Sequence, residues 1–213
     1  MKNVDDLIDG ARQLSERGFS KGEIADELNV SRETASWLVE RSEATPTPSN
    51  EEPKETGGPH DIHVDWSALG RDSSRLAYTG MAMADLLSKR GESVDLTVGI
   101  EKAGAPLATV VARELDTDIA AYAPRKHQWE EGDIDELKGT FSRNFADIRD
   151  RECYVVDDTI TSGTTMRETI DAIRERGGDP VACVVLVDKQ GVEELQGVPV
   201  YSLIQAIRVG NAE

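Results

Sequence analysis

The chain of 213 residues is long enough for one large domain, or for a medium-sized domain joined to a small one. It carries 41 Asp and Glu residues against 24 Lys and Arg, a formal net charge of −17 that is spread along the whole chain. Diffuse acidity with few lysines favours a protein that works in concentrated salt, where self-repulsion is screened; an ordinary acidic cytosolic protein is the alternative.

The cysteines, histidines and apolar runs exclude several classes of protein. Cys153 and Cys183 lie in apolar, strand-like runs and are typical of small buried hydrophobes in a reducing compartment, without the spacing of a metal site. The three histidines do not form a ligand cluster. Because no apolar run approaches ~18 residues and the N-terminus lacks a signal-like stretch, we expect a soluble, cytoplasmic protein without a membrane span.

Residues 1–41 are predicted to form a small head of three helices. Apolar side chains recur at helical spacing from about Val4 to Arg17, from Lys21 to Leu28 and from Arg32 to about Arg41. Ser20 and Ser31 stand at the cap positions before the second and third helices, and Glu23 completes a capping box with Ser20.

This layout resembles a helix-turn-helix DNA-binding unit. Ala25 is small where two helices would cross, Val30 fills the turn, and the run from Val30 to Ala35 is typical of the start of a recognition helix. Such a helix places its N-terminal residues against base edges in the major groove, where Arg32 could pair with guanine while Ser31 contacts phosphate. The DNA-facing set that the resemblance implies is Ser31, Arg32, Glu33, Ser36 and Trp37.

Two alternatives stay open for the head. Trp37 could belong to the helical core instead of contacting bases. The whole head could also serve in dimerisation or protein docking, which its net negative charge favours because DNA affinity usually draws on counterion release. That contribution shrinks in molar salt, so the acidity argues against DNA binding only if the protein works in dilute salt.

Residues 42–60 are predicted to be a flexible linker. The stretch contains four prolines, two glycines and no large apolar side chain, so it cannot bury a core. As a random coil its ends would lie about 24 Å apart, from roughly 5–6 Å times the square root of its length. It separates the head from a larger body, residues 61–213.

The body alternates helix-like and strand-like segments, which is the pattern of a parallel α/β sheet. In such sheets, ligands bind beyond the carboxyl ends of the strands. The predicted elements are a helix at Asp72–Arg90, a strand at Leu96–Ile100, a loop at Glu101–Ala105, a helix at Pro106–Leu115, a strand at Ile119–Ala123, a polar segment from Pro124 to about Asn144, a strand at Glu152–Val156, a helix at Met166–Arg176, a strand at Val181–Val187 and a short strand near Val200–Leu203.

The most informative stretch runs from Tyr154 to Thr165. An apolar strand ends in Asp157 and Asp158, and a loop of small hydroxyl residues around Gly163 leads into a helix. The amides of such a loop converge on a phosphate, while the acids accept hydrogen bonds from sugar hydroxyls or hold a hydrated metal. This order predicts a site for a phosphorylated pentose. A generic turn is the alternative, which is disfavoured because adjacent like charges repel unless a ligand or cation uses them.

The stretch resembles the motif with which type I phosphoribosyltransferases bind phosphoribosyl pyrophosphate (PRPP). The resemblance implies a Rossmann-like parallel sheet, and Mg²⁺ carried by a pyrophosphate ligand near the paired aspartates. The residues that would hold the phosphoribosyl group are Asp157, Asp158, Thr161, Ser162, Gly163, Thr164 and Thr165.

Two further segments would meet the pyrophosphate. The loop after the first strand offers N–H groups at a helix N-terminus, with a simple turn as the alternative. Its residues are Glu101, Lys102, Ala103 and Gly104. Arg125 and Lys126 stand at the root of a long irregular segment that we interpret as a lid able to clamp pyrophosphate; a solvated charge run is the alternative.

Across residues 70–190 the body most resembles orotate phosphoribosyltransferase. The resemblance rests on Gly70-Arg71-Asp72, the run from Gly104 to Ala108, Arg125-Lys126 and the paired acids. It implies transfer of a ribose phosphate from pyrophosphate, in which positioning and charge neutralisation by Mg²⁺ and basic lid residues do most of the catalysis. If the chain is active, the candidate catalytic residues are Lys126 and Glu130, and Lys189 lies on the base side.

The chain departs from the orotate enzymes at three places. Ala103 replaces the lysine that those enzymes carry before the loop glycine, and Lys189 stands where an arginine grips orotate. In the lid only Glu130 could replace their acid, and the segment gains negative charge where pyrophosphate needs positive charge. The phosphoribose subsite is kept, whereas the pyrophosphate clamp is thinned and the base subsite is changed. We therefore expect binding to be retained with turnover weakened or lost.

Taken whole, the chain resembles the haloarchaeal GfcR group of transcriptional regulators, in which an orotate phosphoribosyltransferase-like body carries a helix-turn-helix head. The resemblance implies a homodimeric regulator of sugar-catabolism (glycolysis) genes that binds promoter DNA and senses PRPP or a related phosphorylated sugar. An active orotate or purine phosphoribosyltransferase with an accessory head is the alternative.

Overall fold

The computed structural model describes residues 4–43, 62–90, 92–124 and 139–206. The chain divides into two compact units, Met1–Asp65 and Trp66–Glu213, each with its own apolar core. Residues 44–60 of the predicted linker lie outside the described residues, as do Arg125, Lys126 and Glu130 of the predicted lid. None of the helices in the described ranges combines the length and hydrophobicity that a bilayer span requires.

The described residues of the head form three helices, as the sequence predicted, although the third continues to Glu43, two residues into the predicted linker. The head contains α1 (Val4–Glu16), α2 (Lys21–Leu28) and α3 (Arg32–Glu43). Ser20 and Glu23 form the reciprocal capping box at the start of α2, and the Oγ of Ser31 accepts the Thr34 amide at 3.1 Å at the start of α3. Side chains from the three helices and the turn after α2 share one core: Ala11, Ile24, Ala25, Val30, Ala35, Leu38 and Val39.

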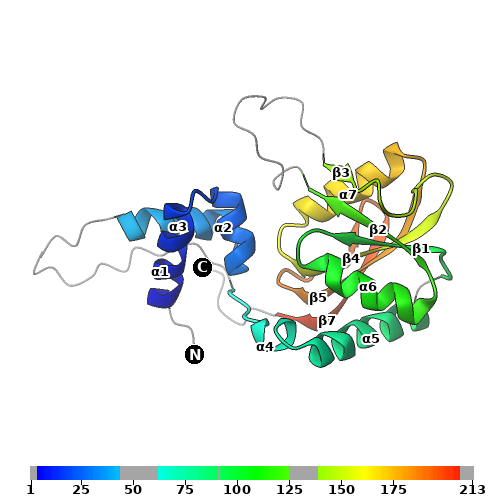
Figure 1. Cartoon of the computed structure of the whole chain (residues 1–213), viewed down its shortest axis with the longest axis horizontal. Helices are drawn as coiled ribbons and strands as arrows, with labels where there is room; N and C mark the ends of the chain where they lie inside the picture. Colours follow the sequence, from blue (N-terminus) through cyan, green and yellow to red (C-terminus); the bar gives the residue numbers. More distant parts are fainter. Residues whose placement is uncertain (1–3, 44–61, 91, 125–138, 207–213) are drawn as a thin grey trace, which may run out of the picture. The chain divides into compact units, whose positions relative to one another are not determined.

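The described strands of the body form one sheet in the order β3-β2-β1-β4-β5-β7-β6 (Figure 1). The five inner strands run parallel, and the two short edge strands run antiparallel to their neighbours. The strands are β1 (Leu96–Ile100), β2 (Asp118–Ala123), β3 (Thr140–Phe141), β4 (Glu152–Ile160), β5 (Asp179–Asp188), β6 (Glu194–Leu195) and β7 (Val198–Gln205).

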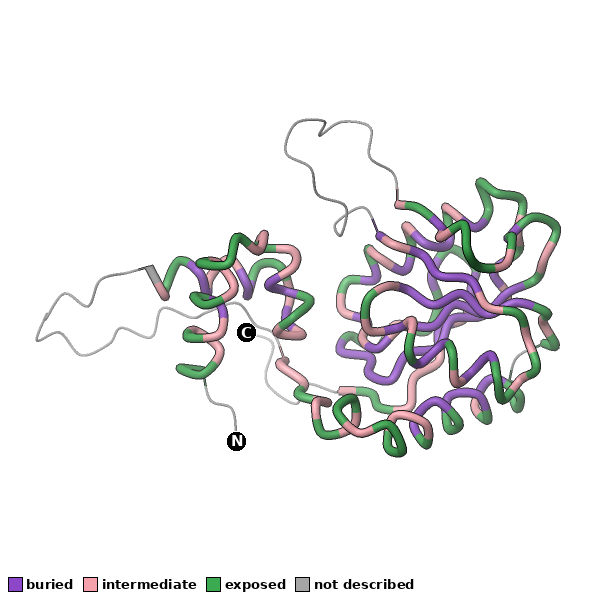
Figure 2. The backbone as a smooth tube through the Cα atoms, viewed as in Figure 1, coloured by how far each residue is buried: buried purple, intermediate pink, exposed green. Residues whose placement is uncertain are grey.

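Helices cover both faces of this sheet. The short α4 (Ser67–Gly70) precedes α5 (Ser73–Arg90), which packs with α6 (Gly104–Leu115) on one face, whereas α7 (Thr164–Glu175) packs on the other. Because successive strand residues face opposite sides, β4 contributes Val155 to the α7 core and Val156 to the core under α5 and α6. Figure 2 shows that buried positions concentrate in the central strands. The predicted parallel α/β architecture is confirmed.

The element that carries the acid pair differs from its prediction. The sequence indicated that the strand ends at Val156, but β4 continues to Ile160, so Asp157 and Asp158 lie inside the strand. The reason is β5, which pairs with the extension through Thr159↔Val187 and Ile160↔Asp188. A hydrogen-bonded neighbour keeps the polar end of β4 extended although its composition resembles that of a loop.

The remaining differences are small. The helices α6 and α7 begin at Gly104 and Thr164, earlier than the predicted Pro106 and Met166. Pro106 is compatible with this earlier start because first-turn N–H groups have no intrahelical acceptor. The elements α4, β3 and β6 were not predicted, since segments of two to four residues are too short to show a hydrophobic period.

Candidate ligand site at the switch point of the sheet

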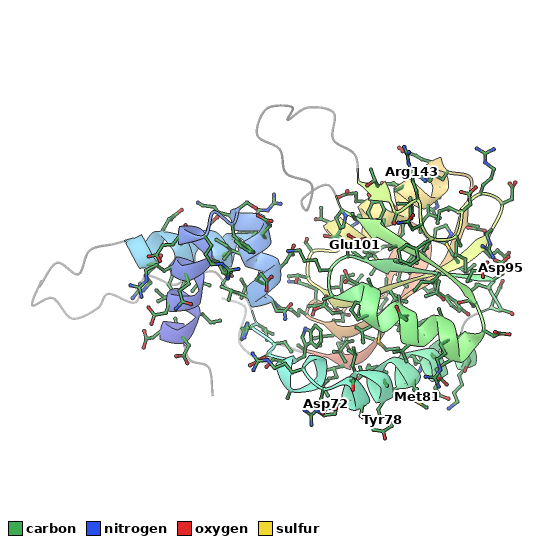
Figure 3. All side chains as sticks on the ribbon, in the orientation of Figure 1. Asp72, Tyr78, Met81, Asp95, Glu101 and Arg143 are labelled. Atoms are coloured by element: carbon green, nitrogen blue, oxygen red, sulfur yellow. The ribbon has the colours of Figure 1, made fainter. Side chains whose placement is uncertain are left out.

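The strands β1 and β4 are neighbours, but the chain leaves them toward opposite edges of the sheet. From β1 it passes through α6 to β2, and from β4 it passes through α7 to β5. Such a topological switch point is where open α/β sheets bind ligands, beyond the carboxyl ends of the strands. Figure 3 shows Glu101 at this end of β1 and Asp95 at the other. The predicted phosphate loop and the predicted pyrophosphate loop therefore follow adjacent strands at the same, carboxyl end of the sheet.

Gly104 brings the start of α6 against β4. A Cβ atom on Gly104 would lie 2.6 Å from the carbonyl oxygen of Val156 and 2.8 Å from the Cα of Asp157, closer than real side chains approach. Ala103 occupies the N-cap position of α6 without a side-chain hydrogen bond, and the peptide bond between Glu101 and Lys102 is cis. The close approach at Gly104 places the backbone of the predicted pyrophosphate loop beside Asp157.

Asp158 is a largely buried carboxylate, with 8% of its surface exposed. Its Oδ2 accepts hydrogen bonds from Nε1 of Trp66 at 2.9 Å and from Oγ1 of Thr159 at 3.2 Å. Both hydrogen bonds that the described residues make to this carboxylate fall on Oδ2. The group is held in one orientation by these hydrogen bonds, and no described residue donates a hydrogen bond to Oδ1.

Asp157 is half-buried and belongs to the opposite face of β4, because successive residues of a strand alternate. Its Oδ1 accepts the amide of Asp158 at 2.9 Å. No group of three His, Cys, Asp or Glu residues suited to a metal occurs among the residues that the structure describes. One carboxylate of the pair is compatible with a Mg²⁺ ion that arrives with ligand phosphates, since Mg²⁺ commonly takes one or two carboxylates together with substrate phosphates, and the Mg²⁺ site stays a prediction.

The loop after β4, which the sequence predicted to bind phosphate, leads through Gly163 into α7. Gly163 precedes α7 with φ of 73°, a left-handed conformation that favours glycine, and it supplies no side-chain cap. The Oγ of Ser162 lies 2.9 Å from Oγ1 of Thr164 and accepts the Thr164 amide at 3.4 Å. Hydroxyls and first-turn amides at a helix N-terminus are the groups that bind phosphate in proteins.

Arg167 lies beside the candidate phosphate loop and was not among the residues predicted from the sequence. It is exposed in the first turn of α7, and its Nη1 donates to the carbonyl of Ser162 at 2.7 Å. The guanidinium charge therefore stands beside the phosphate loop. A signal was present in the sequence, because a cation in the first turn opposes the helix dipole and is unfavourable unless an anion uses it.

The base-side candidate Lys189 is buried directly after β5, with 5% of its surface exposed. Its amide donates to the carbonyl of Ile160 at 3.0 Å, which places it beside the carboxyl end of β4. The preceding Asp188 accepts the amides of Gln190, Gly191 and Val192, so the loop after β5 folds around that carboxylate. The role of Lys189 in binding a base stays a prediction.

The predicted DNA-facing residues of the head occupy different environments. Arg32 and Glu33 are exposed, whereas Ser36 is half-buried and Ser31 is engaged in capping α3. Trp37 is half-buried against the head core, with the guanidinium carbon of Arg41 5.2 Å from the ring centroid. Packing of Trp37 against the core is therefore observed, whereas DNA contact by Trp37 and the rest of this set stays a prediction.

Comparison with known proteins places the chain in a family. The phosphoribosyl transferase domain family matches residues 66–210. The transcriptional regulator GfcR of Haloquadratum walsbyi is 73% identical over 209 residues, which cover 98% of this chain and 95% of that protein. The chain belongs to the family of the GfcR transcriptional regulators. The predicted resemblance to this haloarchaeal group is confirmed, and a haloarchaeal relative also fits the expectation of a high-salt source.

Two solved structures share the fold of the body. Adenine phosphoribosyltransferase from Thermoanaerobacter pseudethanolicus has a TM-score of 0.55 at 19% identity, over 70% of this chain and 89% of that one. Orotate phosphoribosyltransferase from Aeropyrum pernix has a TM-score of 0.52 at 23% identity, over 67% and 78%. The predicted type I phosphoribosyltransferase fold is confirmed. Because both a purine and an orotate enzyme match, the fold does not select a base.

Proposed function

We propose that this transcriptional regulator senses PRPP or a related phosphorylated sugar with its body and binds promoter DNA with its head. It acts in the cytoplasm as a homodimer, at genes of sugar catabolism such as glycolysis. The observation that carries the proposal is the oriented Asp158 carboxylate beside the phosphate loop at the switch point, in a chain of the GfcR family.

Different residues at the switch point bind the phosphate and the sugar of such a ligand. The hydroxyls and amides from Thr161 to Thr165 take the 5-phosphate, and Arg167 offsets its charge. The Oδ1 of Asp158 accepts a ribose hydroxyl. A Mg²⁺ ion carried by a pyrophosphate would be held near Asp157 and would neutralise phosphate charge.

The residues on the pyrophosphate side of the site favour ligand binding without efficient turnover. Ala103 supplies no charge next to Gly104, and the exposed Lys102 stands one position earlier than the lysine of the orotate enzymes. Transfer of a ribosyl group requires charge on the departing pyrophosphate to be neutralised. A site that holds the sugar phosphate but lacks this cation is suited to sensing.

Calorimetry in molar KCl tests the proposal. The chain is titrated with PRPP, ribose 5-phosphate and inorganic phosphate, with and without Mg²⁺. We expect a sugar phosphate to bind and Asp158→Asn to weaken its binding roughly tenfold, because one hydrogen bond to a charged group is lost. Asp85→Asn, on the exposed face of α5, is the control and should leave the affinity unchanged.

A parallel experiment decides between the regulator and the enzyme. The chain is assayed with PRPP, Mg²⁺ and a panel of orotate and purine bases, and its binding to promoter DNA is measured by gel shift in high salt. We expect a DNA shift that responds to the sugar phosphate, with little turnover. Robust turnover without a DNA shift would establish the phosphoribosyltransferase instead, and the absence of any sugar-phosphate binding would overturn the proposed sensing role.

A further inference from the structure

Trp66 is the first residue of the body unit, and its side chain reaches the acid pair. The indole Nε1 donates to Oδ2 of Asp158 at 2.9 Å, between residues that are 92 positions apart in the chain. The carboxylate is shielded from water, and hydrogen bonds to ionised groups are among the stronger ones in proteins. The residue at which the N-terminal segment joins the body is thereby tied to the candidate ligand site.

The turn around Trp66 keeps the indole in place. A Cβ atom on Gly70 would lie 2.5 Å from Cζ3 of Trp66, so the ring packs directly on the backbone of α4. The same turn is fastened to α5, because Nε of Arg75 donates to the carbonyl of Ala68 at 2.5 Å and Asp72 accepts the Arg75 amide at 2.9 Å. The indole is therefore supported on one side by the backbone of α4 while its Nε1 reaches Asp158.

We propose that Trp66 is a positioning residue of the phosphopentose site, and that it couples the occupancy of that site to the start of the segment that leads to the head. Trp66 acts on the ligand through Asp158. The inference rests on the proposed function, because it requires Asp158 to bind a sugar hydroxyl.

The coupling follows from the two oxygens of one carboxylate. Trp66 holds Oδ2, so the orientation of Oδ1 toward a sugar hydroxyl depends on the indole. The Trp66 hydrogen bond changes the free energy of ligand binding by a certain amount. By thermodynamic linkage, ligand binding changes the free energy of the Trp66 hydrogen bond by that same amount. Asp65 precedes Trp66 directly, so a change in the order of Trp66 reaches the last residue of the first unit.

Binding of PRPP with Mg²⁺ in molar KCl, measured by calorimetry, tests the positioning role. Trp66→Phe keeps an aromatic ring but removes the N–H, and we expect it to weaken PRPP binding about tenfold. Gly70→Ala keeps the indole but displaces it, and it should weaken binding in the same direction. Tyr78→Phe, an exposed aromatic position on α5, is the matched control and should bind like the unchanged chain.

A double-mutant cycle separates an action through Asp158 from a general loss of packing. If Trp66 acts through the carboxylate, Trp66→Phe should weaken PRPP binding little or not at all once Asp158→Asn is present, because interacting residues are not additive. Additive losses, or wild-type affinity in both Trp66→Phe and Gly70→Ala, would overturn the positioning role.

Hydrogen exchange followed by mass spectrometry tests the coupling itself. PRPP should slow amide exchange in residues 62–70 of the unchanged chain and should not do so in Trp66→Phe at a saturating concentration. If PRPP binds to the unchanged chain without altering exchange in this segment, the coupling is overturned while the proposed sensing function stands. If neither PRPP nor ribose 5-phosphate binds, the proposed function fails and this inference fails with it.

Discussion

Gly104, the first residue of α6, lies directly against Asp157 of β4. A methyl group on Gly104 would stand 2.8 Å from the Cα of Asp157 and 2.9 Å from its Oδ1. Backbone atoms cannot yield as the end of a flexible side chain can. The contact therefore sets the distance between the loop after β1 and the acid pair, which are the two halves of the candidate site.

Gly104→Ala should damage the site and the fold together. The added methyl group forces α6 away from β4, and overpacking of this kind costs about 1–3 kcal/mol of stability. We expect weaker PRPP binding by calorimetry and a lower melting temperature. Gly80→Ala is the control: its methyl group would lie 2.5 Å from Cβ of Val110 where α5 meets α6, so it should lower stability without changing affinity. Unchanged PRPP affinity in Gly104→Ala would contradict the prediction.

Gly163→Ala tests the phosphate loop. At φ of 73° a side chain adds strain of about 1 kcal/mol, and the methyl group would lie 3.2 Å from Leu195, so either Leu195 or the strained loop must adjust. Gly177 at the end of α7 also has positive φ, of 79°, but lies in a more open environment. Both alanine variants should lose stability in thermal melts, whereas only Gly163→Ala should lose affinity for ribose 5-phosphate. If the two variants bind ribose 5-phosphate with equal affinity, the result would argue against phosphate binding at the turn around Gly163.

Arg32→Ala should reduce promoter DNA binding about tenfold in gel shifts, because a side chain that pairs with a base contributes roughly 1–3 kcal/mol of discrimination. Arg12→Ala removes the same charge from the exposed surface of α1 and is the control for counterion release. Equal losses for the two variants would show that the head attracts DNA by charge alone. No loss for either would favour a docking or dimerisation role for the head.

Both cysteines should be chemically inert in the folded protein. Burial raises the pKa of Cys153 to about 12, and burial also raises the pKa of Cys183. Because the thiolate is the reactive form, neither side chain is nucleophilic at neutral pH. Iodoacetamide should label neither cysteine before unfolding and both after it, as read by mass spectrometry. Rapid labelling of the folded chain would contradict this expectation.

Arg151 should stabilise the sheet in a salt-dependent manner. Its Nη2 donates to Oδ2 of Asp118 at 2.7 Å and to the carbonyl of Asp95 at 3.2 Å, which joins the amino ends of three neighbouring strands. Arg151→Ala should lower the free energy of unfolding by about 1 kcal/mol in dilute salt and by less in molar KCl, because the partner carboxylates are exposed and salt screens them. Arg113→Ala removes a surface ion pair with Glu114 and should have little effect on stability. Thermal melts at both salt concentrations compare the two variants, and a loss that did not shrink in salt would exclude a mainly electrostatic role.

Elements with strong local signals were predicted closely from the sequence. The bounds of β1 agree residue for residue, because a short apolar run buried on both faces is bounded by polar residues. The capping box at Ser20 was also correct, since its two hydrogen bonds join residues three positions apart. The extension of β4 was not foreseen, because it depends on pairing with a strand that follows α7.

The sequence by itself determined the alternation of strands and helices, the caps of the head helices and the order of acids, hydroxyls and glycine from which a phosphopentose site is predicted. These features depend on interactions among residues a few positions apart, which composition and spacing record. Only the tertiary structure decided that Trp66 holds Asp158 and that Gly104 rests on Asp157. Such contacts arise when the helical connections between strands bring distant segments together at the carboxyl end of the sheet, and no local sequence pattern specifies which side chains then meet.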